Sequence, residues 1–248
     1  MDLEINTASV VYTEESITSD YTYKTAIVDD SSNQVTLRQE DIVFRTLRKV
    51  PKVGLMMIGW GGNNGTTLTA GCIANRLKMS WRTKEGEQQS NFYGSLTQSS
   101  TIRIGMNTSG QNVFLPFHKI LPMVDPNDIV LGGWDISSMN LAESMKRAQV
   151  LDYDLQMKLY PHMEHLVPYP GIYKSDFIAL NQSDRTDNVL NGSAQENLDA
   201  IRSNIREFKQ KNKLDKVIVL WTATTERFSD IVPGLNDDAE SLLRSIRV

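Results

Sequence analysis

A glycine-rich turn between an apolar run and a helical segment constrains the fold of this chain more than any other feature. Residues 53–58 (VGLMMI) form an apolar run, the pattern of a parallel strand that is buried on both faces. Four glycines follow, where side chains would block a tight turn and the close approach of a ligand: Gly59, Gly61, Gly62 and Gly65. A helix is expected over residues 66–77, with a buried face made of Leu68, Cys72, Ile73 and Leu77.

The strand, the turn and the helix start together predict an anion-binding site. Asn63 and Asn64 lie in the turn, where Asn tolerates a left-handed backbone and can cap the helix. Unpaired N–H groups and the helix dipole point at one spot, and a dinucleotide pyrophosphate is its usual occupant. However, the spacing is one residue longer than G-x-G-x-x-G, and no acidic residue lies about twenty positions further on to hold a ribose. A glycine-rich turn that only packs against its own helix is the alternative.

The composition is that of an ordinary soluble protein. The chain has 248 residues, enough for one or two domains, with 40% hydrophobic and 23% charged residues. A net charge of −4 without any Lys/Arg run argues against a nucleic-acid surface. Neither a secretory signal nor an apolar run of membrane length is visible, so a cytoplasmic location is expected. The single cysteine, Cys72, is interpreted as a small apolar filler rather than as a nucleophile.

Strand patterns dominate the first fifty residues, and strands alternate with helices thereafter. The early strands are expected at residues 9–12, 21–28, 34–38 and 42–47, with a turn at residues 29–33. After the glycine turn, strands are expected at residues 129–133, 177–180 and 216–221, and a polar loop at 82–90. Helices are expected at residues 140–151, 155–166 and 237–246, and after the capping box formed by Ser193 and Glu196, with Leu198, Ile201, Ile205 and Phe208 on one face. This alternation predicts an α/β fold with a doubly wound parallel sheet.

Ligands of such sheets bind beyond the carboxyl ends of the strands, where several candidate side chains lie. Asp135 follows a strand, so its carboxylate would accept hydrogen bonds from a ribose or, equally, cap the helix near residues 137–140. Arg185 would steer phosphates or be a solvated surface charge. Residues 222–225 are either a binding segment or a polar strand exit. His162 and His165 suggest a metal site, but without a third ligand nearby in sequence an exposed helical pair is the preferred interpretation.

Five segments resemble, in order, signatures of the myo-inositol-1-phosphate synthase (inositol-3-phosphate synthase) family. They are GWGGNNGTTLTAG at 59–71, FYGSLTQSSTIRIG at 92–105, LPMVDPNDIVLGGWDIS at 121–137, DFIALNQ at 176–182 and LWTATTERF at 220–228. The resemblance covers nearly the whole chain, and residues 1–50 are its least distinctive part. It implies a mostly β N-terminal extension at residues 1–50, followed by a Rossmann-like NAD-binding domain at 51–248 that is truncated at its C-terminal end relative to the family.

The resemblance also implies which residues bind the cofactor, and that the cofactor is NAD. The matching positions are Gly61, Gly62, Asn63, Asn64, Asp135, Ile172, Gln182, Arg185, Thr222, Ala223, Thr224 and Thr225. Asp135 would repel the 2′-phosphate of NADP, although four basic residues offer themselves as phosphate acceptors: Arg76, Lys78, Arg82 and Lys84. Thr224 stands where the family usually has asparagine, and Leu180, Ser183 and Asp184 also depart from its pattern.

The activity implied by the resemblance is an NAD-dependent isomerisation of D-glucose 6-phosphate to 1D-myo-inositol 3-phosphate, in inositol and phospholipid biosynthesis. The family oxidises the sugar at C5, enolises it, closes the ring by an aldol step and returns the hydride. The acid–base lysines of the family belong to the second half of its proteins. We therefore expect no catalytic residue in this chain and no activity from the chain alone. Lys174 is the one local lysine expected near the site. A second copy or a full-length synthase is the expected partner. The alternatives are a non-catalytic NAD-binding or regulatory truncated isoform and, with less support, an ordinary sugar dehydrogenase.

Overall fold

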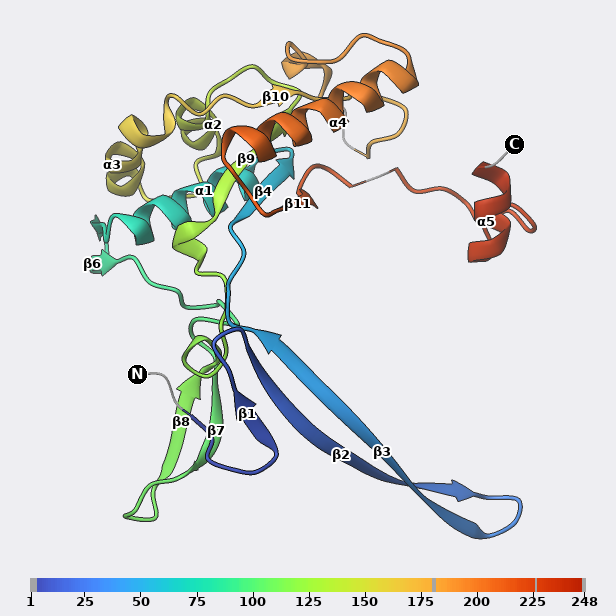
Figure 1. Ribbon diagram of the computed structural model, residues 1–248. Coiled ribbons are helices and arrows are strands. Elements are labelled where there is room, and N and C mark those ends of the chain that lie inside the picture. Colours follow the sequence, from blue (N-terminus) through green and yellow to red (C-terminus); the bar gives the residue numbers. More distant parts are fainter. Residues whose placement is uncertain (1–3, 180–181, 226, 247–248) are drawn as a thin grey trace. The chain divides into compact units, whose positions relative to one another are not determined.

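The computed structural model describes residues 4–179, 182–225 and 227–246 (Figure 1). The chain divides into two compact units, each built from three separate segments. The first unit contains residues 1–54, 71–130 and 209–218, and the second contains residues 55–70, 131–208 and 219–248.

A three-stranded antiparallel sheet occupies the N-terminal part of the first unit. Strand β1 (Val10–Tyr12) pairs with β2 (Ser16–Asp29), and β2 pairs with β3 (Gln34–Leu47) along the whole length of both strands. The predicted turn between β2 and β3 is confirmed, and the Asp29 carboxylate accepts hydrogen bonds from the hydroxyls of Ser31 and Ser32. Residues 34–38 and 42–47, predicted as two strands, form one continuous strand, because the polar residues between them pair equally well with β2.

Two shorter hairpins also belong to the first unit, and the sequence did not predict them. Strands β5 (Ser80–Thr83) and β6 (Gly86–Gln89) pair with each other, as do β7 (Thr101–Met106) and β8 (Asn112–Pro116). Two 3-10 turns follow, η1 (Phe117–Lys119) and η2 (Pro126–Asp128). The prediction of a polar loop at residues 82–90 was therefore wrong. Strand β6 is exposed along its whole length, so its polar composition reflects contact with water rather than irregular backbone.

The parallel sheet predicted from the sequence is confirmed. Its four strands are β4 (Val53–Ile58), β9 (Val130–Asp135), β10 (Tyr169–Pro170) and β11 (Lys216–Trp221), in the order β10-β9-β4-β11. The two inner strands provide the core, since Met56, Met57 and Trp134 are almost completely buried. Strand β11 forms an edge of the sheet, and its apolar side chains from Ile218 to Trp221 are exposed among the described residues.

Helix α1 (Asn63–Arg76) follows β4, as predicted, but begins three residues earlier. The expected buried face was wrong, because Leu68 and Leu77 are exposed. The buried positions instead carry small or short side chains: Thr66, Thr69, Ala70 and Ala74. A short side chain is needed where a helix lies close to neighbouring backbone, and Gly65 illustrates this, since a Cβ there would lie 2.2 Å from the carbonyl oxygen of Trp60.

Four further helices complete the described chain: α2 (Leu141–Ala148), α3 (Tyr153–Met163), α4 (Ala194–Lys211) and α5 (Ala239–Ile246). The capping box before α4 is confirmed, because the Ser193 N–H donates to the Glu196 carboxylate and the Glu196 N–H donates to the Ser193 hydroxyl. On the predicted face of α4, Phe208 is buried and Leu198 is exposed. No helix in the described part of the chain is long and apolar enough to span a membrane.

The strand predicted at residues 177–180 is not formed by its described part. A turn occupies residues 175–177, and the Phe177 side chain is 51% exposed. Leu180 lies outside the described residues. The apolar letters of this segment suggested a buried strand, but apolar side chains also occur on exposed loops, and periodicity alone does not distinguish the two.

Candidate cofactor-binding site

The candidate site lies in the second unit, where four strands end and the chain leaves the sheet. Strand β4 runs into Gly59, β9 ends at Asp135, β10 is followed by Gly171 and Ile172, and β11 is followed by Thr222. Because parallel strands bring their carboxyl ends to one edge, these segments are neighbours although they are far apart in the sequence.

The turn after β4 is held by backbone hydrogen bonds to the next strand and to itself. The N–H groups of Gly59 and Trp60 both donate to the carbonyl of Trp134 in β9, at 2.8 and 2.9 Å. Gly59 has a φ of +86°, which an L side chain rarely adopts. The Gly62 N–H closes the turn on the Gly59 carbonyl at 2.9 Å, and α1 begins at the next residue. The N–H groups of the first helical turn have no intrahelical partners, so they are available to an anion.

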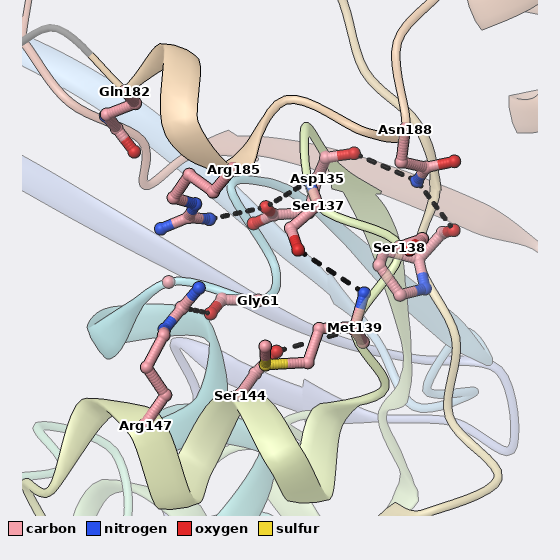
Figure 2. Close-up of polar contacts among 12 residues, drawn as sticks. Gly61, Asp135, Ser137, Ser138, Met139, Ser144, Arg147, Gln182, Arg185 and Asn188 are labelled. Atoms are coloured by element: carbon pink, nitrogen blue, oxygen red, sulfur yellow. Dashed lines mark hydrogen bonds and ion pairs between the residues drawn. The ribbon is translucent and has the colours of Figure 1, made fainter.

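Gly61 is the point where the turn meets two other elements (Figure 2). A Cβ on Gly61 would lie 3.1 Å from the Oδ2 atom of Asp135 and 3.2 Å from the hydroxyl oxygen of Ser144 in α2. Arg147, also in α2, donates a hydrogen bond from Nη2 to the Gly61 carbonyl at 2.7 Å. A side chain at Gly61 would therefore push against the carboxylate that ends β9.

The Asp135 carboxylate is buried, with 3% of the residue exposed, and two donors hold its Oδ1 atom. Nη2 of Arg185 lies 2.7 Å from Oδ1, and the Ser137 N–H donates to the same oxygen at 3.0 Å. Asp135 does not cap the helix that follows. The N-cap of α2 is Asn140, whose side-chain oxygen accepts the Glu143 N–H at 2.9 Å. Asp135 therefore joins β9 to the segment that contains Arg185.

Arg185 lies in the 3-10 turn η3 (Ser183–Arg185), and it is paired rather than freely solvated. Its Nε atom is buried and has no hydrogen-bond partner among the described residues. Gln182, just before η3, donates its side-chain amide to the Thr224 hydroxyl, and its N–H donates to the Tyr173 hydroxyl at 3.1 Å. The neighbouring Asn181 lies outside the described residues.

The segment after β11 packs against the first glycine of the turn. The Thr222 N–H and hydroxyl both donate to the Ile58 carbonyl, at 3.0 and 2.9 Å. A Cβ on Gly59 would lie 2.9 Å from the Cα of Ala223, so this close contact requires glycine. The Thr225 carbonyl accepts the Ala179 N–H at 3.0 Å. The start of this segment is thus fixed to β4, and its end to the loop after β10.

The structure does not bring all predicted residues into one cluster. Asn63 and Asn64 are exposed in the first turn of α1, and Ile172 is 45% exposed on the loop after β10. Four basic residues were considered as phosphate acceptors. One is the last residue of α1 and the others come after it in the sequence, whereas the glycine turn precedes α1: Arg76, Lys78, Arg82 and Lys84. The Arg76 guanidinium donates to the carbonyls of Asn127 and Ile129.

The sequence did not predict Ser144 and Arg147, whose part in the site depends on how α2 packs. Burial lowers the pKa of the Arg147 guanidinium, the positive charge of Arg185 lowers it further, and the Asp135 carboxylate opposes this shift. Their only signal in the sequence is that they lie three residues apart, which places them on the same side of a helix.

His162 and His165 are both exposed, and the described residues contain no group of three His, Cys, Asp or Glu side chains positioned to hold a metal ion.

Comparisons with known proteins agree on one family. A family model for an NAD-binding domain, described as myo-inositol-1-phosphate synthase, matches residues 53–248. Inositol-3-phosphate synthase 1 of Homo sapiens is 52% identical over 98% of this chain and 44% of its own length, and the Dictyostelium discoideum synthase is 51% identical over 98% of this chain and 48% of its own. The crystal structure of the Caenorhabditis elegans synthase has a TM-score of 0.89 at 43% identity, covering 100% of this chain and 49% of that one. The chain thus spans about half the length of these relatives.

Proposed function

This chain belongs to the myo-inositol-1-phosphate synthase family and carries its NAD-binding domain, and from this premise we propose that it supplies the cofactor half of an inositol-3-phosphate synthase. The family resemblance carried by five sequence segments is confirmed. In this proposal the complete enzyme converts D-glucose 6-phosphate to 1D-myo-inositol 3-phosphate. The described chain binds and orients NAD, and the acid–base groups come from outside it.

The glycine turn supports the placement of the pyrophosphate. Between Gly61 and the first turn of α1 the backbone is free of bulky side chains, and Asn63 and Asn64 are exposed there. Helix N-termini attract phosphate through their unpaired N–H groups and their dipole. The competing interpretation, a turn that only packs against its own helix, explains Gly65 but not Gly61, whose Cβ would contact β9 and α2 instead.

The Asp135 carboxylate supports the placement of the adenosine ribose. Both hydrogen bonds that hold it go to Oδ1, whereas Oδ2 faces the glycine turn. An ionised carboxylate accepts hydrogen bonds only, so Oδ2 suits a ribose hydroxyl as donor. The buried Nε of Arg185, which lacks a partner among the described residues, is a further polar group that a bound ligand would satisfy.

The segment after β11 supports the placement of the nicotinamide end. When bound, NAD supplies a hydride acceptor that is regenerated within the turnover. Thr222 and Ala223 are fixed against β4, and Thr224 is tied to Gln182, so this chain contributes a rigid wall beside the ring. Lys174 is exposed on the loop that contains Ile172.

The observation that carries the proposal is the closeness of Gly61 to Asp135, where a Cβ on the glycine would lie 3.1 Å from Oδ2, because it brings the pyrophosphate turn and the ribose carboxylate together. Isothermal titration of the chain with NAD tests it directly. We expect Gly61→Val to abolish binding, since the side chain would displace Asp135 and fill the approach to the turn. Gly71→Val is the matched control on the same helix, where a Cβ would meet nothing within 4 Å.

Circular dichroism must show that both variants fold. NAD binding by the folded Gly61→Val variant at the affinity of the parent chain would refute the assignment of the turn. Equal loss of binding in both variants would show that the effect comes from damage to α1 rather than from the site.

A further inference from the structure

Two arginines lie beside the carboxylate of Asp135, although a ribose hydroxyl needs only the carboxylate. Arg185 approaches from η3 and contacts Oδ1 at 2.7 Å, whereas Arg147 approaches from α2 and reaches the Gly61 carbonyl at 2.7 Å (Figure 2). The Oδ2 atom lies 3.1 Å from the Cβ position of that same glycine. Two guanidinium groups and one carboxylate therefore meet around Gly61.

The charges of this cluster do not balance. Asp135 carries one negative charge, and Arg147 and Arg185 carry one positive charge each, because arginine stays protonated at neutral pH. Arg147 does not form an ion pair in the described structure, since its contact is with a neutral carbonyl oxygen. Arg185 retains a buried Nε donor without a partner in the described part of the chain. The cluster thus has spare positive charge and spare donors.

We propose that Arg147 and Arg185 form a latent site for the 2′-phosphate of NADP, which Asp135 alone keeps closed and thereby sets the preference for NAD. This inference rests on the proposed function, through the placement of the adenosine ribose at Asp135. A 2′-phosphate is a strong hydrogen-bond acceptor with negative charge, and arginine suits it because its planar guanidinium donates two parallel hydrogen bonds. The Asp135 carboxylate would repel that group from within the same cluster.

The four basic residues around the C-terminal end of α1 are not needed for this preference. A helix rises about 1.5 Å per residue, so the 14 residues of α1 separate its two ends by roughly 20 Å. Arg147 and Arg185 are the cations that contact the residues of the site itself, Gly61 and Asp135.

Dissociation constants for NAD and NADP, measured by titration of the purified chain, test the inference. The set of proteins is the parent chain, Asp135→Asn, Arg147→Met, the double variant with both changes, and Lys146→Met. Asparagine keeps an oxygen for Arg185 and for the Ser137 N–H but removes the charge. Lys146 is the matched control, because it is an exposed cation one residue away on α2.

We expect Asp135→Asn to shift the NADP-to-NAD affinity ratio toward NADP by at least about tenfold, and the double variant to lose most of this gain. In the otherwise unchanged chain, Arg147→Met is expected to weaken NADP binding more than NAD binding, and this result does not depend on the folding of Asp135→Asn. Lys146→Met should leave the ratio unchanged.

Three outcomes would overturn the inference. The first is a folded Asp135→Asn variant whose affinity ratio stays at the parent value. The second is an Arg147→Met variant that weakens both cofactors equally, because Arg147 would then only clamp the Gly61 carbonyl. The third is a parent chain that binds neither cofactor, which would also overturn the proposed function, whereas the first two leave NAD binding by the parent chain intact.

Discussion

Gly65 and Gly71 lie on the same helix, yet a methyl group at the two positions would meet opposite surroundings. At Gly65 the Cβ would lie 2.2 Å from the Trp60 carbonyl oxygen, a backbone atom that cannot move aside cheaply, whereas at Gly71 nothing lies within 4 Å. Gly65→Ala should therefore destabilise the fold by about 1–3 kcal/mol, as overpacking does. Gly71→Ala should stabilise it by about 0.5–1 kcal/mol, because alanine favours the helix. Urea unfolding of the two variants measures both signs, and a change of the same sign in both would contradict the packing of α1.

Thr224 replaces the asparagine usual in the family, and its hydroxyl accepts the amide of Gln182. Thr224→Val removes this acceptor and leaves a partly buried donor without a partner. A hydrogen bond of this kind contributes about 0.5–1.5 kcal/mol, so we expect NAD to bind about 2–10-fold more weakly. Thr224→Ser keeps the hydroxyl and should retain the parent affinity. If valine and serine bind NAD equally well, the contact does not order the cofactor.

From residue patterns alone, single residues of the site could be predicted only at the end of a strand, whereas Gln182 and Arg185 were predicted from the family resemblance. The glycine turn and Asp135 were predicted because a strand's carboxyl end is where ligands bind in parallel sheets. The ion pair between Asp135 and Arg185 joins residues 50 positions apart, and no pattern in the sequence reports such a distance. Arg147 was missed for a related reason, since its contact with Gly61 depends on the packing of α2 against the turn.

Elements with a recognisable pattern of apolar residues were easier to predict than elements without one. Strands β4 and β9 have apolar residues because they lie inside the sheet, and the β11 run from Ile218 to Trp221 has the same pattern. The hairpin of β5 and β6, whose second strand is exposed along its whole length, has no such pattern, so a loop was predicted over most of it. The segment at residues 177–180 produced the opposite error, because its apolar residues suggested a strand, whereas its described part has a turn residue, one isolated bridge residue (the half-buried Ile178) and a bend.

The start of α4 should be sensitive to acid. Hydrogen bonds from the backbone and then from the hydroxyl of Ser193 lower the pKa of Glu196 below its usual range. A lowered pKa in the folded state means that the stabilisation is present at neutral pH and is lost as the pH falls through that lowered value. The melting temperature of the parent chain should therefore fall more steeply below pH 5 than that of Glu196→Gln, which keeps a capping side chain without a titrating charge. Parallel curves for the two proteins would show that the capping box does not depend on ionisation.

At the scale of the whole molecule, we expect binding without turnover. The described chain positions cofactor contacts at the strand ends, whereas the family's acid–base lysines are expected in its second half. Among the local lysines, Lys174 lies on the exposed loop after β10, and Lys52 donates to the Asn212 carbonyl. General acid–base groups contribute about 10²–10⁴-fold each, so a site that lacks several of them should fall below detection.

Labelled glucose 6-phosphate incubated with NAD and the purified chain, followed by chromatography of the dephosphorylated product, measures this turnover. We expect no labelled myo-inositol. Labelled product that disappears in the Lys174→Ala variant would show that this half performs chemistry that we place elsewhere.

The second unit consists of three segments that are separated along the chain, and this bears on the moment at which the protein can first hold its cofactor. Thr222 closes the site against Ile58, its partner 164 positions earlier, and Ala223 packs on Gly59. A ribosome adds residues from the N-terminus, at about 5–20 residues per second, so the glycine turn leaves the exit tunnel many seconds before Ala223 is made. Throughout that interval the turn lacks its close contact with Ala223. If NAD binds as proposed, its full set of contacts would therefore form only after translation has passed β11.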